Sequence, residues 1–461
     1  MDSLEYMTAL DIAQAIRTGE LSSLEATRYF LERAQADNDR MGAFALITER
    51  KAIRQAKKAD ARRAKSKAPE RLPLFHGVPS AVKDLVPTRG IRTQLGSRAY
   101  AYFIPPFDGA IAQRMKDGGL VSIGKLATSE LGVMPITEND VGPPVRNPWC
   151  PQRNAGGSSG GSGAAMAAGL IPIAHASDGG GSIRIPAAFC HRYGFKPSLS
   201  LLGNLHGQVN RLGLSVMGPI AYTVQDAAAM LDVMAGRPHG GASHVSCLKA
   251  SQSPPPPLRI GVCVESAVTD VHPEHQSATH QVADTLRSLG HTVQDICPIM
   301  ATVDEFLPIW QYMIAQVPVF METKLQPITQ ALRRSGREVT YARAKSIQKR
   351  LATLIQESMS DIDILLTPTT PGPPPLIGEF SRHDDPMDAF HAAAPIGSFT
   401  ALFNLTQGPA ASHPVTQTKE GTPIGVQLGA KPGYDHLLLS LSAQLESALP
   451  TLDRFPKLTG A

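Results

Sequence analysis

Two glycine- and serine-rich stretches decide the fold: AGGSSGGSGA at residues 155–164 and SDGGGSIRIP at residues 177–186. Each runs straight into apolar sequence, AAMAAGLIPIA after the first and AAF after the second. A flexible linker would not continue in this way, so we predict two ordered loops. Glycine lets backbone amides approach a bound molecule closely, and consecutive N–H groups before a serine can hold a developing negative charge.

Short apolar runs and glycine loops surround these stretches and indicate an α/β fold. Before them, Ala9, Ile12 and Ile16 recur at helical spacing, and after residue 257 the segments LRIGVCV and HTVQDI flank a helical pattern. Four consecutive prolines, ending at Pro257, interrupt the chain between these parts. We expect a helical arm at 1–70, an α/β core at 71–236, a loop or linker at 237–257, and a part at 258–461 that completes the same sheet and contains a mostly helical region at 301–360.

The composition is that of a globular protein, with 42% hydrophobic and 18% charged residues. The net charge of +4 is small and does not require a nucleic-acid partner, so none is expected. The basic segment at 51–71 is compatible with a nucleic-acid or acidic-lipid patch. Alanines at 52, 56 and 59 mark a buried side, however, and favour a solvated helix face.

The cysteines and histidines suggest neither a disulfide framework nor a metal site. The five cysteines are widely spaced, which predicts reduced thiols in a cytoplasmic protein. His272, His275 and His280 match no metal-ligand spacing and indicate the start of a surface helix. The first residues carry acids and lack a continuous apolar core, so we expect no signal peptide. No apolar stretch reaches about 18 residues, so no transmembrane segment is expected.

Three short motifs match common catalytic patterns, but their context argues against each. Residues 156–160 fit the G-x-S-x-G elbow of α/β-hydrolases, although a polar loop precedes them where a strand is needed. Ser80-Ala-Val-Lys83 fits the S-x-x-K of penicillin-binding enzymes, yet no S-D-N or K-T-G follows. Residues 119–125 nearly fit a phosphate loop, but Leu126 stands where a hydroxyl would bind Mg²⁺.

Taken in chain order, the segments of this sequence resemble the amidase signature family. HGVPSAVKDL (76–85) is similar to the family's lysine segment, RNPWCPQRNAGGSSGGSGAAMAAG (146–169) to its glycine–serine signature, and SDGGGSIRIPAAFC (177–190) to its nucleophile segment. GFKPS, GPIAYTVQDAAAMLDVMAG, DILLTPTTP, FNLTQGPA and GTPIGVQL match later family segments in order. The resemblance implies a single large α/β domain whose mixed, twisted central β-sheet is covered by helices on both sides.

The resemblance also implies a catalytic set in which Ser182 is the nucleophile, Ser158 the bridging serine and Lys83 the base. A serine hydroxyl is a poor nucleophile at neutral pH and needs a neighbouring base. Lysine acts as a base only when it is neutral, so its pKa must fall by roughly 2–3 units from about 10.4. Burial without a carboxylate partner achieves this, and Asp84 must therefore point away from Lys83.

Further residues receive roles only through the resemblance. The oxyanion hole would be formed by the amides of Gly179, Gly180, Gly181 and Ser182, with Ser159, Asp178 and Arg184 as supporting residues. A cis peptide bond would join Gly157 to Ser158. No cofactor and no metal are implied.

The reaction implied is hydrolysis of a carbon–nitrogen amide bond through an acyl-enzyme on Ser182. Two alternatives stay open: an acyltransferase that passes the acyl group to an amine, and the glutaminase subunit of a tRNA-dependent amidotransferase. Gly179 replaces a bulkier residue that is common in the family, which resembles the branch containing 6-aminohexanoate cyclic dimer hydrolase. The expected partner is a small-molecule amide, and a homodimer is left open.

Substrate choice is expected to depend on the helical region 301–360 and on two loops, 371–375 and 396–406, which in the family face the nucleophile. The aromatic residues in these segments are Trp310, Tyr312, Phe320, Phe399 and Phe403. They predict a substrate with an apolar group. For the segment 303–320, packing in the core is the favoured interpretation, and a wall of the substrate cleft and contact with a membrane surface are the alternatives.

Overall fold

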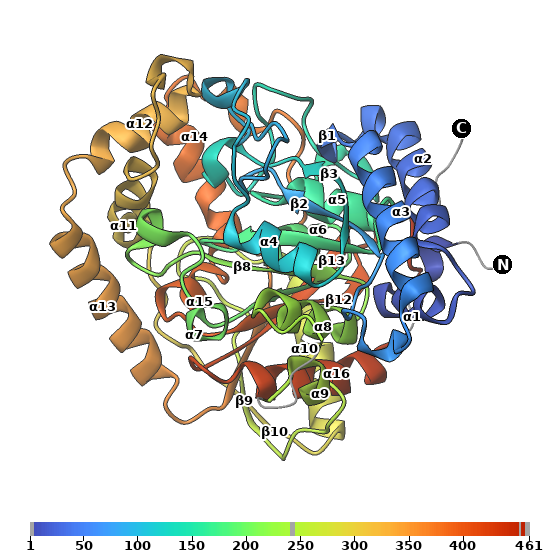
Figure 1. The fold of residues 1–461 in the computed structure, drawn as a ribbon. Coiled ribbons are helices and arrows are strands. Elements are labelled where there is room, and N and C mark those ends of the chain that lie inside the picture. The colour runs from blue at the N-terminus through green and yellow to red at the C-terminus, as the bar shows by residue number, and fades with distance from the viewer. Residues whose placement is uncertain (1–3, 240–244, 451–452, 457–461) are drawn as a thin grey trace.

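A mixed β-sheet of 11 strands runs through the part of the chain that the computed structural model describes, residues 4–239, 245–450 and 453–456 (Figure 1). In spatial order its strands are β1 (Phe44–Ile47), β3 (Val121–Leu126), β2 (Pro79–Lys83), β6 (Ile173–Asp178), β8 (Val216–Ala221), β7 (Tyr193–Lys196), β12 (Ala410–Gln417), β13 (Pro423–Ala430), β11 (Ile364–Pro368), β9 (Arg259–Val262) and β10 (Thr292–Asp295). A short two-stranded sheet of β4 (Arg146–Asn147) and β5 (Cys150–Asn154) precedes the first glycine loop.

Two parallel blocks flank an antiparallel centre in this sheet. Strands β3, β2 and β6 run parallel to one another, as do β11, β9 and β10. The neighbouring strands between the two blocks pair antiparallel. Parallel neighbours bring their carboxyl ends to the same edge of a sheet, which is where ligands bind in α/β folds.

Helices connect and cover the strands. They are α1 (Ala9–Thr18), α2 (Ser23–Met41), α3 (Glu49–Lys65), α4 (Ala110–Asp117), α5 (Gly160–Ala167), α6 (Arg184–Phe189), α7 (Leu199–Leu202), α8 (Val224–Met234), α9 (Cys247–Ala250), α10 (Pro273–Ser288), α11 (Val303–Ala315), α12 (Pro327–Gly336), α13 (Tyr341–Ser358), α14 (Pro386–Ala393), α15 (Ala401–Leu405) and α16 (Asp435–Ala448). None of the described helices combines the length and the apolar character needed to cross a bilayer.

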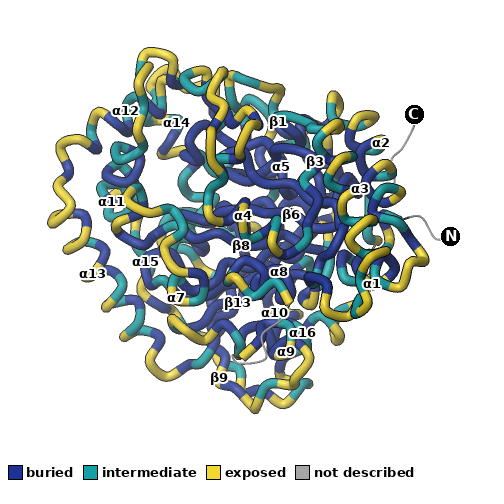
Figure 2. Tube along the Cα trace, in the orientation of Figure 1, coloured by how far each residue is buried: buried dark blue, intermediate teal, exposed yellow. Residues whose placement is uncertain are grey.

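The inner strands of the sheet are buried on both faces. Every residue of β2, β6 and β13 is buried, and Figure 2 shows the buried chain concentrated in the middle of the molecule. Strands buried along their whole length need cover on both sides. The predicted fold class, a single α/β domain with a mixed central sheet covered by helices on both sides, is therefore confirmed.

The segments expected around the core take up defined places. The blue helices α1, α2 and α3 lie together at the right of Figure 1. The predicted strand–helix–strand after residue 257 corresponds to β9, α10 and β10. Residues 240–244 of the predicted linker lie outside the described residues. The rest of it is not a free linker, because the amides of Cys247 and Leu248 donate to Asp232 at 2.9 and 3.1 Å.

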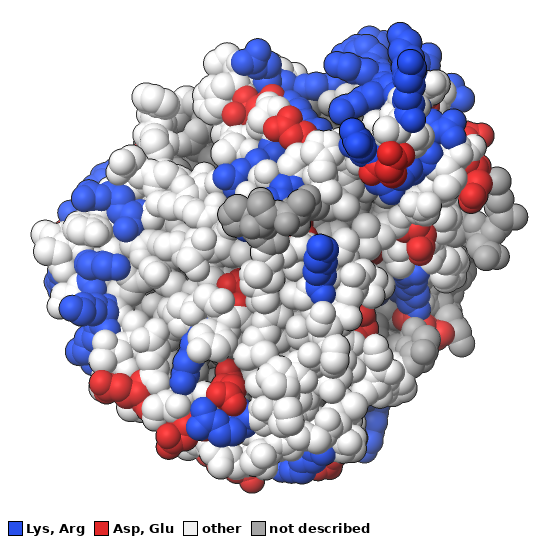
Figure 3. Space-filling model, turned by 60° about the horizontal axis from the view of Figure 1, so that its bottom comes forward, with Lys and Arg blue, Asp and Glu red and all other residues white. Residues whose placement is uncertain are grey.

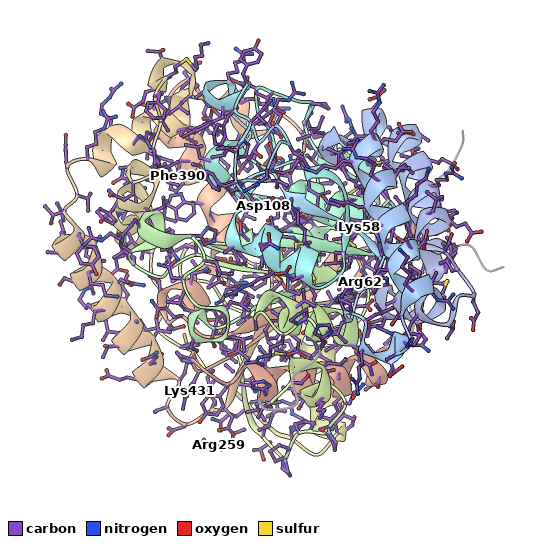
Figure 4. All side chains as sticks on the ribbon, in the orientation of Figure 1. Lys58, Arg62, Asp108, Arg259, Phe390 and Lys431 are labelled. Atoms are coloured by element: carbon purple, nitrogen blue, oxygen red, sulfur yellow. The ribbon has the colours of Figure 1, made fainter. Side chains whose placement is uncertain are left out.

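Helix α3 carries the basic segment and has the two-sided character that the alanines indicate. Ala52 and Ala56 are buried, and Ala59 is half-buried. Lys58 and Arg62 are exposed and project from the helix in Figure 4. Figure 3 shows Lys and Arg side chains gathered at one corner of the face that it draws.

A buried carboxylate fastens the N-terminal helices to the core, and its removal is predicted to loosen them. Asp226 on α8 accepts from the amides of Ala9 and Leu10, at 3.1 and 3.0 Å, in the first turn of α1. Asp226→Ala leaves these buried donors unpaired, so we expect a loss of about 1–3 kcal/mol in the free energy of unfolding, measured by urea denaturation. Asp11→Ala removes only an exposed capping contact on the same helix and should cost less. Equal losses for the two variants would contradict this role of Asp226.

Candidate active site

The site begins at the ends of two neighbouring parallel strands. Lys83 is the last residue of β2, and Ser177 and Asp178 end β6. The pairing of Ala81 with Ala174 sets the register that brings these ends together. Lys83 Nζ donates to Ser177 Oγ at 3.1 Å across the two strands.

Lys83 is buried among hydroxyl groups. Its side chain is fully buried, and its Nζ also donates to Ser158 Oγ at 2.7 Å. In the described ranges no carboxylate forms an ion pair with it. Burial lowers the pKa of Lys83 to about 7, against a smaller opposing effect of the Asp178 carboxylate. A large fraction of Lys83 is therefore a neutral amine near neutral pH.

The neighbouring carboxylate is directed elsewhere, as the sequence requires. Successive side chains of a strand point to opposite faces, and Asp84 follows Lys83 directly. Asp84 Oδ1 lies 3.1 Å from Lys125 Nζ on β3, and both side chains are buried. Lys125 Nζ also donates to the carbonyl of Val86 at 2.6 Å and to Thr93 Oγ1 at 2.8 Å. The Asp84 carboxylate is thus paired with Lys125 and not with Lys83.

The first glycine loop positions Ser158. The peptide bond between Gly157 and Ser158 is cis. A β-carbon on residue 157 would lie 2.5 Å from the carbonyl oxygen of Ile136, so only glycine fits. Next to it, Ser159 Oγ donates to the carbonyl of Ser177 at 3.2 Å and accepts from the amide of Ser177 at 3.4 Å. These contacts fasten the loop to the end of β6, beside Lys83.

The second glycine loop is folded around a buried carboxylate. The amides of Gly181 and Ile183 donate to Asp178 at 2.8 and 3.1 Å. Arg184 binds the same carboxylate through Nε at 3.0 Å and Nη2 at 2.8 Å. Burial alone would raise the pKa of Asp178, but the Arg184 guanidinium outweighs it and holds that pKa well below its usual range. The loop that carries Ser182 therefore closes on an ion pair.

Arg184 ties this loop to the C-terminal part of the chain. Its Nη1 donates to the carbonyl of Thr400 at 2.8 Å and to Gln427 Oε1 at 2.7 Å, and its Nη2 donates to Asn404 Oδ1 at 2.7 Å. Asn404 Nδ2 donates in turn to Asp178 Oδ1 at 2.9 Å. All the donor groups of the guanidinium are used, so its orientation is fixed.

The amides before Ser182 are not equivalent. The amide of Gly181 is engaged by Asp178. Those of Gly179, Gly180 and Ser182 make no hydrogen bond within the residues that the structure describes. Ser182 Oγ likewise has no hydrogen-bond partner there, and Ser182 is 8% exposed, to a cavity. Of these residues, Gly180 and Ser182 line the cavity, and Gly179 precedes them in the loop.

That cavity has a volume of about 90 Å³ and is partly open to solvent. Its lining carries no acidic or basic side chain and consists of Val133, Met134, Pro135, Gly180, Ser182, Ile185, Val268, Met300, Ala301, Thr302, Val303, Phe306, Trp310, Phe390, Ala394, Gly397, Ser398, Ala401 and Leu402. Residues of α11 and α15, together with the segments just before each of them, thus form most of the wall. Apolar groups fit such a lining.

Most of the aromatic residues expected in the cleft lie elsewhere. Of the five, only Trp310 lines the cavity, together with Phe306 and Phe390, which the sequence did not single out. Tyr312, Phe399 and Phe403 are buried away from the cavity, and Phe320 is 97% exposed. The loop 371–375 lines a different cavity, so its expected part in the cleft is wrong.

Some residues of the site were not foreseen. Ser177 gives Lys83 its second hydroxyl partner, and Asn404 and Gln427 hold Arg184. The matching segments FNLTQGPA and GTPIGVQL contain Asn404 and Gln427 and were the available signal. Lys196, on β7, is a second buried lysine whose pKa burial lowers to about 7.

The histidines 272, 275 and 280 have structural places. His272 is the N-cap of α10, and its Nδ1 accepts from the amide of Glu274 at 3.3 Å. His275 Nδ1 lies 3.0 Å from the carbonyl of Thr370. Among the described residues, no three or more His, Cys, Asp or Glu side chains are grouped as a metal ion would need.

The ion pair of Asp84 and Lys125 yields a stability prediction. Lys125→Met leaves the buried Asp84 carboxylate without its cation, and we expect the free energy of unfolding to fall by about 3–5 kcal/mol. Lys125→Met combined with Asp84→Leu removes both charges and should recover much of that loss. Thermal and urea unfolding of both variants measure the difference. A double variant no more stable than Lys125→Met would contradict a compensated buried pair.

Comparisons with known proteins identify the family. The model of the Amidase family matches residues 25–439. A putative amidase of Synechocystis sp. is 34% identical over 96% of this chain and 88% of its own length, and a glutamyl-tRNA(Gln) amidotransferase subunit of Thermus thermophilus is 33% identical over 96% and 97%. The solved structure of 6-aminohexanoate cyclic dimer hydrolase superposes with a TM-score of 0.87 at 29% identity, covering 99% of each chain. The chain belongs to the amidase family.

Proposed function

We propose that the protein hydrolyses a carbon–nitrogen amide bond through an acyl-enzyme on Ser182, with Ser158 and Lys83 as a proton relay. The observations that carry the proposal are the buried contact of 2.7 Å between Lys83 Nζ and Ser158 Oγ and the position of Ser182 in the lining of the cavity. A neutral lysine at this place supplies the base that a serine nucleophile needs.

The chemistry follows from these positions. Neutral Lys83 takes the proton of Ser158 Oγ as Ser158 takes that of Ser182, and Ser182 Oγ attacks the amide carbon. The oxyanion that forms is held by the amides of Gly179, Gly180 and Ser182, which have no other partner among the described residues. The C–N bond then breaks while Ser158 passes its proton to the leaving amine and regains one from Lys83, which becomes neutral again. Water attacks the ester by the same relay and releases the carboxylic acid.

The cavity supports an amide that carries an apolar group. Because its lining has no charged side chain, nothing there pairs with the ammonium and carboxylate of free glutamine. The similarity to the glutamyl-tRNA(Gln) amidotransferase chain makes a glutaminase subunit the second candidate. Ammonia release from glutamine by the purified protein separates the two, and we expect glutamine to be a poor substrate. Added hydroxylamine should divert the acyl group if transfer to amines competes with water.

The cysteines fit a reducing compartment, and we propose the cytoplasm. All five are free, and Cys150, Cys190, Cys247 and Cys263 are buried. Burial raises the pKa of the Cys150 thiol to about 12, so it remains unreactive.

Ser182→Ala should abolish turnover while the protein stays folded, since Ser182 Oγ has no hydrogen bond to lose within the described residues. In a screen of linear, cyclic and aryl amides we expect a loss of about 10⁴-fold or more. A fluorophosphonate probe should label Ser182, as peptide mapping will show. Ser80→Ala is the matched control, because Ser80 Oγ donates only to the carbonyl of Ile173 and the S-x-x-K pattern would make it the nucleophile. Labelling of Ser80 or Ser159 would overturn the assignment.

The pH dependence should report Lys83. Because protonated Lys83 is inactive, kcat/KM should rise with pH along one limb whose apparent pKa is near the value of about 7 that burial gives Lys83. Lys83→Met should cost several orders of magnitude. Lys196→Met removes the other buried lysine of similar pKa and should leave the limb in place. If the limb disappeared in Lys196→Met, the titrating group would be Lys196 and not Lys83.

The pH dependence of the free energy of unfolding reports the pKa of Lys83 without any substrate. Between pH 7 and 10.5 the unfolded chain binds a proton on Lys83 that the folded chain lacks, so stability rises with pH across that window. The free energy of unfolding of the wild type should therefore rise over this range relative to that of Lys83→Met. Parallel curves for the two proteins would show that Lys83 is not perturbed.

A further inference from the structure

Two aromatic rings lie against the loop that carries Ser182. A β-carbon on residue 179 would lie 3.0 Å from Trp310 Cζ3 and 3.2 Å from Cη2, and one on residue 180 would lie 3.8 Å from Phe306 Cζ. Phe306 and Trp310 are one turn apart on α11, with ring centroids 5.9 Å apart and ring planes inclined by 28°. Both rings line the cavity. They form a flat wall beside the free amides of Gly179 and Gly180.

This wall depends on the glycine at residue 179. The distance of 3.0 Å is shorter than an ordinary contact between carbon atoms, so even alanine at this place would push against the indole ring. Helix α12 packs closely on α11, since a β-carbon on Gly336 would lie 2.0 Å from the carbonyl oxygen of Gln311. A side chain at 179 and a tryptophan at 310 therefore compete for one space.

We propose that Gly179 and Trp310 form a matched pair that determines substrate specificity: the tryptophan occupies the space that a side chain at 179 would fill, and with Phe306 it stacks on a flat aryl group bonded directly to the scissile amide. The inference rests on the proposed hydrolysis at Ser182. The carbonyl oxygen must reach the amides of Gly179 and Gly180, so the group nearest the two rings is the one attached to the amide itself. Aromatic rings prefer offset stacked neighbours at such distances.

Paired substrates separate flatness from size. Acetanilide against N-cyclohexylacetamide places the ring on the amine, and benzamide against cyclohexanecarboxamide places it on the acyl group. The aryl-to-cyclohexyl ratio of kcat/KM in one pair should fall by about 2- to 10-fold in Trp310→Leu. The pair that responds identifies the side of the amide that stacks. Phe390→Leu is the matched control, since Phe390 lines the same cavity from α14 (Figure 4) and should leave the ratio unchanged.

The coupling between the two positions has its own test. Gly179→Ala should lower the aryl preference by displacing the indole ring, and adding Trp310→Leu should restore the rate of fluorophosphonate labelling that Gly179→Ala reduces. Losses that simply add in the double variant would overturn the matched pair.

Fluorescence tests the stacking without turnover. The chain has two tryptophans, so in a Trp149→Phe, Ser182→Ala background the emission comes from Trp310 alone. The aryl amide should change that emission at concentrations where its cyclohexyl analogue does not. The change would support stacking even if no amide were hydrolysed, in which case the proposed reaction alone would fail. Equal responses to both analogues, together with an unchanged rate ratio in Trp310→Leu, would overturn the inference.

Discussion

The site depends on one constraint: a lysine is buried beside hydroxyl groups with no carboxylate paired to it among the described residues. An unpaired buried ammonium is costly, and the protein meets that cost by lowering the pKa of Lys83 to about 7. The pairing of Asp84 with Lys125 is part of the same arrangement, because it directs the carboxylate next to Lys83 in the chain to another lysine. The order of residues along one strand thus sets the protonation state that the chemistry requires.

The nucleophile loop is held by residues from distant parts of the sequence. Asp178 and Arg184 close the loop locally. The Arg184 guanidinium is held from later in the chain by Thr400 just before α15, by Asn404 in α15 and by Gln427 in β13. The end of β2 supplies Lys83, the end of β6 supplies its partner Ser177, and the first glycine loop supplies Ser158. The core and the C-terminal part therefore complete one site as well as one sheet, which explains why the family match spans both.

The sequence was sufficient for the fold, because its short segments match those of the family in order along the chain. The roles that it implies for Ser182, Ser158 and Lys83 stay predictions, while the structure brings Lys83 into contact with Ser158 and places Ser182 in the lining of the cavity. The sequence was insufficient for predicting which side chains face the cavity and which amides are free. Helical spacing in 303–320 shows an apolar stripe but not which residues face a cavity, so Tyr312 was expected there and Phe306 was missed. Likewise, a run of glycine amides does not reveal that Asp178 engages that of Gly181.

Acylation of Ser182 is tested most directly by trapping the acyl-enzyme. Turnover of the best amide found by screening would be quenched with acid within its first cycles. The masses of the intact protein and of its peptides would then be measured by mass spectrometry. We expect the mass of the wild type to increase by that of the acyl group, located on Ser182, and the mass of Ser182→Ala to stay unchanged. An acyl group on another residue, or a burst of amine release with no covalent adduct, would contradict it.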